Sequence, residues 1–161
     1  MAIFSTATAV VADVSAVLLN IALGCALMIV TTVIHAACTV ATLQALKVTH
    51  AGRWGPATHL TRATLIASVV LMMFVAALVE SAIWAVTYVV VGAISGFEPA
   101  LYFSMVTFTT LGYGDIVLPD GWRLLASFQA ANGIIMFGWT TALIIAVAHY
   151  VHSEHVADHG S

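Results

Sequence analysis

Long stretches without a formal charge constrain this chain more than any other feature of its sequence. With histidines neutral, residues 14–46 and 124–151 carry no formal charge, and in residues 63–95 the only charged side chain is Glu80. About 20 apolar residues suffice for a helix to cross a bilayer, so each stretch is long enough. We therefore predict an all-α integral membrane protein with three transmembrane helices.

The composition supports a membrane partner and argues against a nucleic-acid partner. Apolar residues make up 62 % of the chain and charged residues 7 %, whereas a soluble domain is roughly 25 % charged. The formal net charge of -3 and the lack of a basic cluster exclude nucleic acid as an expected partner. Cys25 and Cys38 both fall in the first apolar stretch, where we expect packing residues and neither a disulfide nor a metal motif.

The first apolar stretch, residues 12–48, is unusually long for a membrane helix. As one helix it measures roughly 50 Å, against a hydrocarbon core of about 30 Å, so it must tilt or project beyond the membrane. We favour one long helix; a break near Gly24 or His35 is the alternative. Glycine and proline punctuate residues 50–56, which predicts a loop, and a second helix is expected over residues 62–94.

A shorter apolar segment follows the second helix. Residues 95–99 break that helix, and Pro99 suits the first turn of a new one. Residues 99–109 are too few to cross a bilayer and suit a re-entrant helix. A turn at residues 119–121 then precedes a third membrane helix, which we expect to begin near Trp122.

The basic residues predict how the chain is oriented. Lys47, Arg53 and Arg62 lie in or beside the loop between the first two helices, and only Arg123 lies on the other side. The positive-inside rule places that loop in the cytoplasm. We therefore expect a multi-pass protein of the cell (inner) membrane, with its N-terminus and re-entrant loop outside and its C-terminus in the cytoplasm.

The residues after the re-entrant helix have a backbone suited to binding a cation. Irregular backbone at membrane depth is tolerated only where it is buried in protein or lines a watery cavity. Here Thr110, Leu111, Gly112, Tyr113 and Gly114 occupy that position, followed by Asp115. Alternate glycines permit successive carbonyls to turn to one side, and stacked carbonyl oxygens replace the hydration shell of K⁺. Thr110 adds a hydroxyl at the inner end, and Tyr113 is expected to brace the segment from behind.

These residues resemble the selectivity filter of the potassium-channel family, whose sequence is TVGYG. Leu111 replaces the valine, and its side chain is expected to point away from the ions. The resemblance covers roughly residues 63–151, running from residues 100–104 through Thr109 and Thr110 to Gly133 and Phe137. It looks like the outer-helix, pore-helix, filter and inner-helix module of two-helix bacterial channels, here with one extra N-terminal membrane helix.

The resemblance implies a homotetramer that conducts K⁺ passively, surrounded by membrane lipid, with K⁺ held at residues 110–113. It implies no catalysis and no organic cofactor. The expected organisation is a long first helix in residues 1–49, a cytoplasmic loop in residues 50–61, a pore domain in residues 62–152 and a short cytoplasmic tail in residues 153–161.

The same resemblance assigns roles on the last membrane helix. Gly133 occupies the hinge position, and Ile134, Phe137, Thr141 and Ile145 face the cavity and the inner gate. Their spacings of three, four and four residues place them on one helix face. The alternative is that they are ordinary lipid or helix contacts and that Gly133 is a packing glycine.

One position departs from the pattern of some family members. They keep a glutamate behind the filter, which pairs with the aspartate after it, and Val106 stands at that position here. Asp115 has no carboxylate partner there, so we expect Tyr102 to donate a hydrogen bond to it. Slow inactivation that depends on an acidic pair is in doubt.

Polar side chains inside the apolar stretches are candidates for anchoring or gating. Burying an ionised carboxylate in a membrane costs at least a few kcal/mol, so Glu80 is protonated, paired or near water. Its candidate partners are Asn132, Trp84, Trp139 and His35. Asn132 is itself expected to face protein or water. Structural anchoring and proton-sensitive gating both remain open for Glu80.

Four histidines near the C-terminus share one face if the last helix continues, namely His149, His152, His155 and His159. Three interpretations remain open: a frayed solvated tail, a divalent-metal site, and a pH-sensitive element that splays four helices on protonation.

Other functions fit the sequence less well. A weakly selective cation channel conflicts with the intact glycine–tyrosine–glycine of residues 112–114, and a potassium uptake transporter usually carries four pore loops in one longer chain. From a different class, His35 together with the tail histidines suggests a haem-binding electron carrier, which a visible absorption band would reveal.

Overall fold

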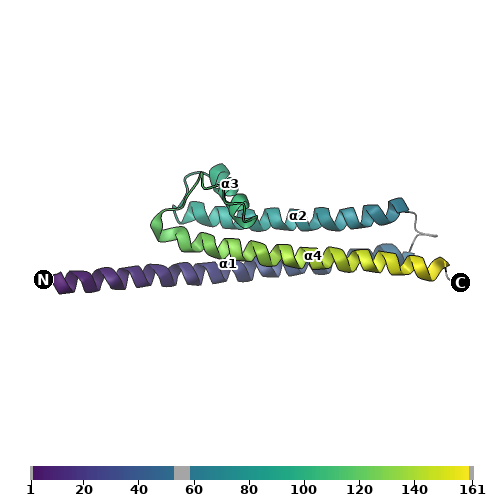
Figure 1. Cartoon of the computed structure of the whole chain (residues 1–161), viewed down its shortest axis with the longest axis horizontal. Coiled ribbons are helices and arrows are strands. Elements are labelled where there is room, and N and C mark those ends of the chain that lie inside the picture. Colours follow the sequence, from purple (N-terminus) through teal and green to yellow (C-terminus); the bar gives the residue numbers. More distant parts are fainter. Residues whose placement is uncertain (1, 53–58, 160–161) are drawn as a thin grey trace. The chain divides into compact units, whose positions relative to one another are not determined.

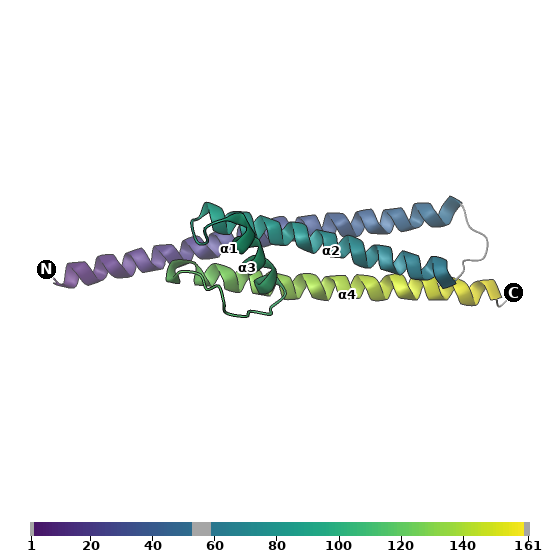
Figure 2. The same ribbon diagram turned by 90° about the horizontal axis from the view of Figure 1, so that it is seen from above.

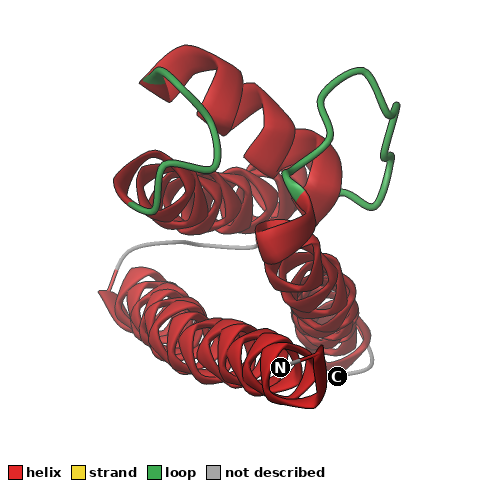
Figure 3. Cartoon of the chain, turned by 90° about the vertical axis from the view of Figure 1, so that its left-hand side faces the viewer, coloured by secondary structure: helices red, strands yellow, loops and turns green. Residues whose placement is uncertain are grey.

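The computed structural model describes the backbone of residues 2–52 and 59–159, and the side chains of residues 11, 13–46, 60–61 and 63–150. Every regular element within these residues is a helix (Figure 3). The elements are α1 (Ala2–Gly52), α2 (His59–Val90), α3 (Phe97–Phe108), the short 3-10 helix η1 (Asp120–Trp122) and α4 (Arg123–His159).

Three of these helices are long and apolar enough to cross a membrane, as predicted. The candidate spans are Asp13–Leu46, Ala63–Val90 and Asp120–Tyr150. The first is one unbroken helix, so the expected single long helix is confirmed and the alternative break near Gly24 or His35 is not. The chain is an all-helical, multi-pass membrane protein.

α2 ends four residues earlier than the predicted boundary, at Val90. Gly92 has a φ of 71°, and the N–H groups of Ala93 and Ile94 both donate to the carbonyl of Tyr88. Bonds of this kind satisfy carbonyls at a helix end, and a glycine in the left-handed region makes them possible. The backbone therefore leaves the helix at Gly92, before the break expected at residues 95–99.

The chain forms two compact units, and α1, α2 and α4 each contribute to both. The first unit consists of Met1–Thr31 and Glu80–Ile134, and the second of Thr32–Val79 and Ile135–Ser161. Within the first unit, α3 and the loop after it lie beside the C-terminal end of α2 and the N-terminal end of α4 (Figure 1).

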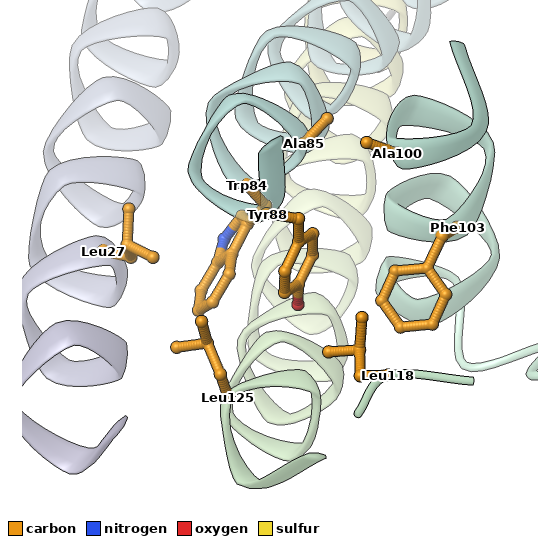
Figure 4. Close-up of a cluster of buried hydrophobic side chains, with 8 residues drawn as sticks. All are labelled: Leu27, Trp84, Ala85, Tyr88, Ala100, Phe103, Leu118 and Leu125. Carbon is orange, nitrogen blue, oxygen red and sulfur yellow. The ribbon is translucent and has the colours of Figure 1, made fainter. Parts of the chain in front are cut away.

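The core of the first unit joins all four helices around Trp84 and Tyr88, which are fully buried on α2. Figure 4 shows Leu27 of α1 and Leu125 of α4 on one side of them and Phe103 of α3 on the other. The rings of Tyr88 and Phe103 meet edge to face, with centroids 5.2 Å apart. This packing positions α3 and the loop that it carries.

The second unit is a packed group of three helices. Leu46 of α1, Val69 and Met73 of α2, and Leu143 and Val147 of α4 form its buried cluster, and Figure 2 shows these parts of α1, α2 and α4 running alongside one another.

The two cysteines are free thiols with different environments. Cys38 packs against the cluster of the second unit, as expected. Cys25 is exposed in the chain, so the prediction that it packs inside is wrong. It lies on the face of α1 that turns away from the core.

Candidate functional site: the loop after helix α3

α3 is a short helix with a glycine directly before it and a proline in its first turn. Gly96 precedes it with a φ of 91°, and Pro99 lies in its first turn, where the missing N–H group leaves no bond unmade. Its 12 residues span about 18 Å, which is less than the thickness of a membrane core. The buried face of α3 consists of Ala100, Phe103, Ser104 and Phe108.

The segment after α3 is tied to the last turn of the helix by backbone hydrogen bonds. The N–H of Thr110 donates to Thr107 at 2.9 Å. The N–H groups of Leu111 and Gly112 both donate to the carbonyl of Val106, at 3.0 and 3.2 Å. Val106, which stands where some family members have a glutamate, therefore holds the loop through its backbone carbonyl.

The backbone of this loop alternates in a way that suits cation binding. The φ angles of Thr110, Gly112 and Gly114 are 60°, 53° and 79°, while Leu111 and Tyr113 between them are not in the positive region. Residues with positive φ that alternate with residues of negative φ turn successive N–H groups to one side, and their carbonyls to the other. Within the described part of the chain, no carbonyl of residues 110–114 accepts a hydrogen bond.

The large side chains of the loop are exposed in the single chain. Leu111 is 55 % exposed and Tyr113 is 66 % exposed. The bracing expected of Tyr113 is therefore not provided by its own chain.

The hydrogen bond expected between Tyr102 and Asp115 is present. The Tyr102 hydroxyl donates to Oδ2 of Asp115 at 2.6 Å, and the N–H of Ile116 donates to Oδ1 at 3.1 Å. The bond from Tyr102 is the main cause that lowers the pKa of Asp115 below its ordinary value. The same bond raises the pKa of Tyr102. Among the described residues, Asp115 is thus held at the end of the loop by a tyrosine hydroxyl and a backbone N–H, with no acidic partner.

A buried polar network behind α3 was not predicted from the sequence. Gln129 of α4 donates from Nε2 to the Ser104 hydroxyl at 2.6 Å and to the Ser104 carbonyl at 3.1 Å. Its Oε1 accepts from the Tyr88 hydroxyl at 2.8 Å, and Ser104 in turn donates to the carbonyl of Ser81 at 2.6 Å. All four residues are buried, so α3 is held to α2 and α4 by bonds that water does not weaken. The sequence signal for this network was Gln129 itself, because a polar side chain within an apolar stretch needs a hydrogen-bond partner.

Gly133 fits tightly against the end of α3. A Cβ at this position would lie 1.9 Å from the carbonyl oxygen of Phe108, so only glycine permits the contact. The packing role left open by the sequence is therefore present, and the hinge role stays a prediction. Gln129 meets Ser104 and Gly133 meets Phe108, so these parts of α3 and α4 run in step for one helical turn.

The four predicted pore-lining residues of α4 are exposed in the chain, namely Ile134, Phe137, Thr141 and Ile145. Ile134 is 63 % exposed, whereas Asn132 is fully buried on a face about 160° away. α4 thus has a packed face and an exposed, mainly apolar face.

The intramembrane polar residues Asn132, Glu80 and His35 are all buried. Asn132 donates to Thr31 of α1 at 2.9 Å, and Trp84 Nε1 makes no hydrogen bond to any residue that the structure describes, so neither is the partner of Glu80 that the sequence suggested. Glu80 itself is fully buried. In the second unit, His35 is buried with Nε2 3.2 Å from the Thr140 hydroxyl and its ring edge-on to Trp139.

Several predicted residues fall outside the described side chains. These are Lys47, Arg53, Arg62, His152, His155 and His159. The backbone of α4 is helical as far as His159, and His149 is exposed. Among the described residues, no group of three or more His, Cys, Asp or Glu side chains gathers as metal ligands do.

Three membrane-length helices, with a short helix and loop between the last two, are features of a membrane channel. Residues 59–149 match the model of the family described as Ion channel. The match covers more than half of the chain, which therefore belongs to this ion channel family. Helix α1 precedes the matched residues. No curated protein and no solved structure matches the chain.

Proposed function

We propose that this chain is a subunit of a potassium-selective channel whose filter is the backbone of residues 110–114. The alternating φ angles of Thr110, Gly112 and Gly114, with carbonyls that accept no bond inside the described chain, carry the proposal. Carbonyls aligned on one side of a chain supply the oxygen ligands that replace the hydration shell of K⁺. The ion is the transported substrate, and no residue needs to perform a reaction.

The exposure of the loop supports assembly into a homotetramer. Non-helical backbone at membrane depth must be buried in protein or line a water-filled cavity. In one chain the loop has its large side chains Leu111 and Tyr113 exposed, so further copies must enclose it. Four loops around one axis would form a closed ring of carbonyls and would also enclose the exposed face of α4.

The proposed orientation places the loop and Asp115 on the outer side of the cell membrane and the C-terminus in the cytoplasm. It rests on the charge distribution of the sequence. Asp115, ionised and held by Tyr102, then lies where an outer carboxylate attracts cations.

The test compares K⁺ and Na⁺ flux in liposomes, with barium as a blocker. We expect barium-sensitive K⁺ flux at least about tenfold faster than Na⁺ flux in the native protein, because matched carbonyl sites discriminate between the ions. Gly112→Ala should abolish K⁺ selectivity, since an L-residue in the left-handed region costs roughly 1–2 kcal/mol.

Gly92→Ala is the matched control. Gly92 also has a positive φ of 71° and, like Gly112, has no atom of the described residues within 4 Å of an added Cβ, but it lies outside the loop. Equal K⁺ and Na⁺ flux in the native protein would reject selectivity and leave a weakly selective cation channel.

A further inference from the structure

Helix α1, which precedes the family match, packs against α4 and the turn before it through a row of contacts at matching positions, which we call the α1–α4 seam. Within the first unit, Asn20 of α1 donates to the carbonyl of Gly121 at 2.8 Å. About two turns further along α1, Leu27 lies in the same buried cluster as Leu125, and about one turn after that Thr31 accepts from Asn132 at 2.9 Å. Both hydrogen bonds join residues 101 positions apart, so α1 and α4 run parallel and in step.

The seam is close as well as regular. A Cβ at Gly24 would lie 2.6 Å from Cγ of Phe128, so the glycine allows the Phe128 ring to approach the backbone of α1. On α1 the contacts fall at residues 20, 24, 27 and 31, with the three-and-four spacing of a helix pair that packs knobs into holes. Small residues allow membrane helices to pack at this distance.

The inner end of the seam lies beside the glycine that the family pattern assigns as a hinge. Asn132 immediately precedes Gly133 and is fully buried, as is Thr31. The Thr31 hydroxyl is fixed in turn, because it donates to the carbonyl of Leu27 at 2.9 Å. Among the described residues, Oδ1 of Asn132 has no hydrogen-bond partner, so within them the bond to Thr31 is what orients this amide.

We infer that Thr31 of α1 is a positioning residue that holds α4 in its unbent form through Asn132, so that α1 restrains the opening of the pore. The inference rests on the proposed channel function for its electrical consequence. The contact is made by α4 as one continuous helix. Asn132 lies in the helical turn that contains Gly133, so a bend of α4 at Gly133 has to distort the turn that the bond to Thr31 fixes. Asn132 lies on the face of α4 about 160° from Ile134, so α1 acts on the helix from behind the proposed pore.

Single-channel recording of matched variants tests the role. Thr31→Val keeps the shape of the side chain and removes the hydroxyl, whereas Thr31→Ser keeps the hydroxyl. A hydrogen bond of this kind between membrane helices favours one state by about threefold on average. We expect Thr31→Val to raise the open probability by about threefold or more, with unitary conductance and K⁺/Na⁺ selectivity unchanged and Thr31→Ser equal to the native protein.

A double variant separates a specific bond from general damage. If Thr31 acts through Asn132, Asn132→Leu and Thr31→Val together should change the open probability no more than Asn132→Leu alone. Unchanged or lowered open probability in Thr31→Val, or effects of the two substitutions that simply multiply, would overturn the inference.

A distance measurement tests the inference even if the native protein does not conduct K⁺. A spin label at Ala146→Cys, in a Cys25→Ser and Cys38→Ser background, reports the separation of α4 helices between copies. Thr31→Val should shift this distance distribution to longer values, and Thr31→Ser should not. Identical distributions in all three would contradict the restraint, whereas absence of K⁺ flux in the native protein would contradict only the proposed function.

Discussion

At the scale of single residues, Asp115 shows how a tyrosine hydroxyl, in place of a second acid, holds the carboxylate that follows the loop. The Tyr102 hydroxyl donates to it at 2.6 Å, and this bond lowers the pKa of Asp115 from its ordinary value of 3.8. Because the bond favours the ionised form, its contribution to the stability of the folded chain is complete above the ordinary pKa of Asp115. It is lost as the pH falls through the lowered pKa.

Tyr102→Phe should therefore raise the pKa of Asp115 toward 3.8. Since an ionised carboxylate at the outer mouth attracts cations, K⁺ current measured while the outer pH is lowered should decline at a higher pH in the variant than in the native protein. Asp115→Asn removes the titrating group and should abolish this part of the decline in both backgrounds. Coincident titrations of the native protein and Tyr102→Phe would show that the bond does not control the carboxylate.

At the scale of elements, the position of α3 depends on two points of contact with α4, one turn apart. Gln129 bonds to both the hydroxyl and the carbonyl of Ser104, and Gly133 contacts the backbone of Phe108. The loop starts at once after α3, and its first N–H groups bond to Val106. A shift of α3 along α4 therefore moves the loop directly.

Gly133→Ala tests this dependence. Its Cβ would lie 1.9 Å from the Phe108 carbonyl oxygen, so α3 must move, and such overpacking costs typically about 1–3 kcal/mol. We expect lower thermal stability in detergent and loss of K⁺-selective flux. Gly138→Ala is the control on the same helix, because it has open space around it and alanine favours a helix by up to about 1 kcal/mol. Equal stability of the two variants would mean that α3 tolerates displacement.

At the scale of the whole molecule, the proposed assembly predicts a specific effect of the transported ion. A ligand that binds only the folded assembly stabilises it by RT ln(1 + [L]/Kd), which is about 2.7 kcal/mol at 100 times Kd. K⁺ held by carbonyls of four chains should therefore stabilise the tetramer against heat or detergent, and Na⁺ at equal ionic strength should not. Native mass spectrometry should detect a species of four times the chain mass. A stable dimer or monomer in both salts would refute the assembly.

Much of the fold was predictable because it depends on local features of the chain. Uncharged stretches identified the three membrane helices, and the glycine and proline residues before α3 identified where a short helix begins. The Tyr102 to Asp115 hydrogen bond was also expected, since both residues flank one short loop. The exposed position of Cys25 was not, because the hydropathy of α1 is nearly uniform and does not reveal which face packs.

The sequence by itself determined that the long helices of this protein lie in a membrane, and it determined which backbone angles the loop after α3 can adopt. Hydropathy decides where a helix can lie, and alternate glycines decide which backbone angles a short segment can adopt. Only the tertiary structure decided which side chains meet: Gln129 with Ser104 and Tyr88, and Thr31 with Asn132. Each of these pairs joins residues on different helices, far apart in the chain, and no local pattern specifies the partner of a lone buried polar group. The partner depends on the register at which whole helices pack.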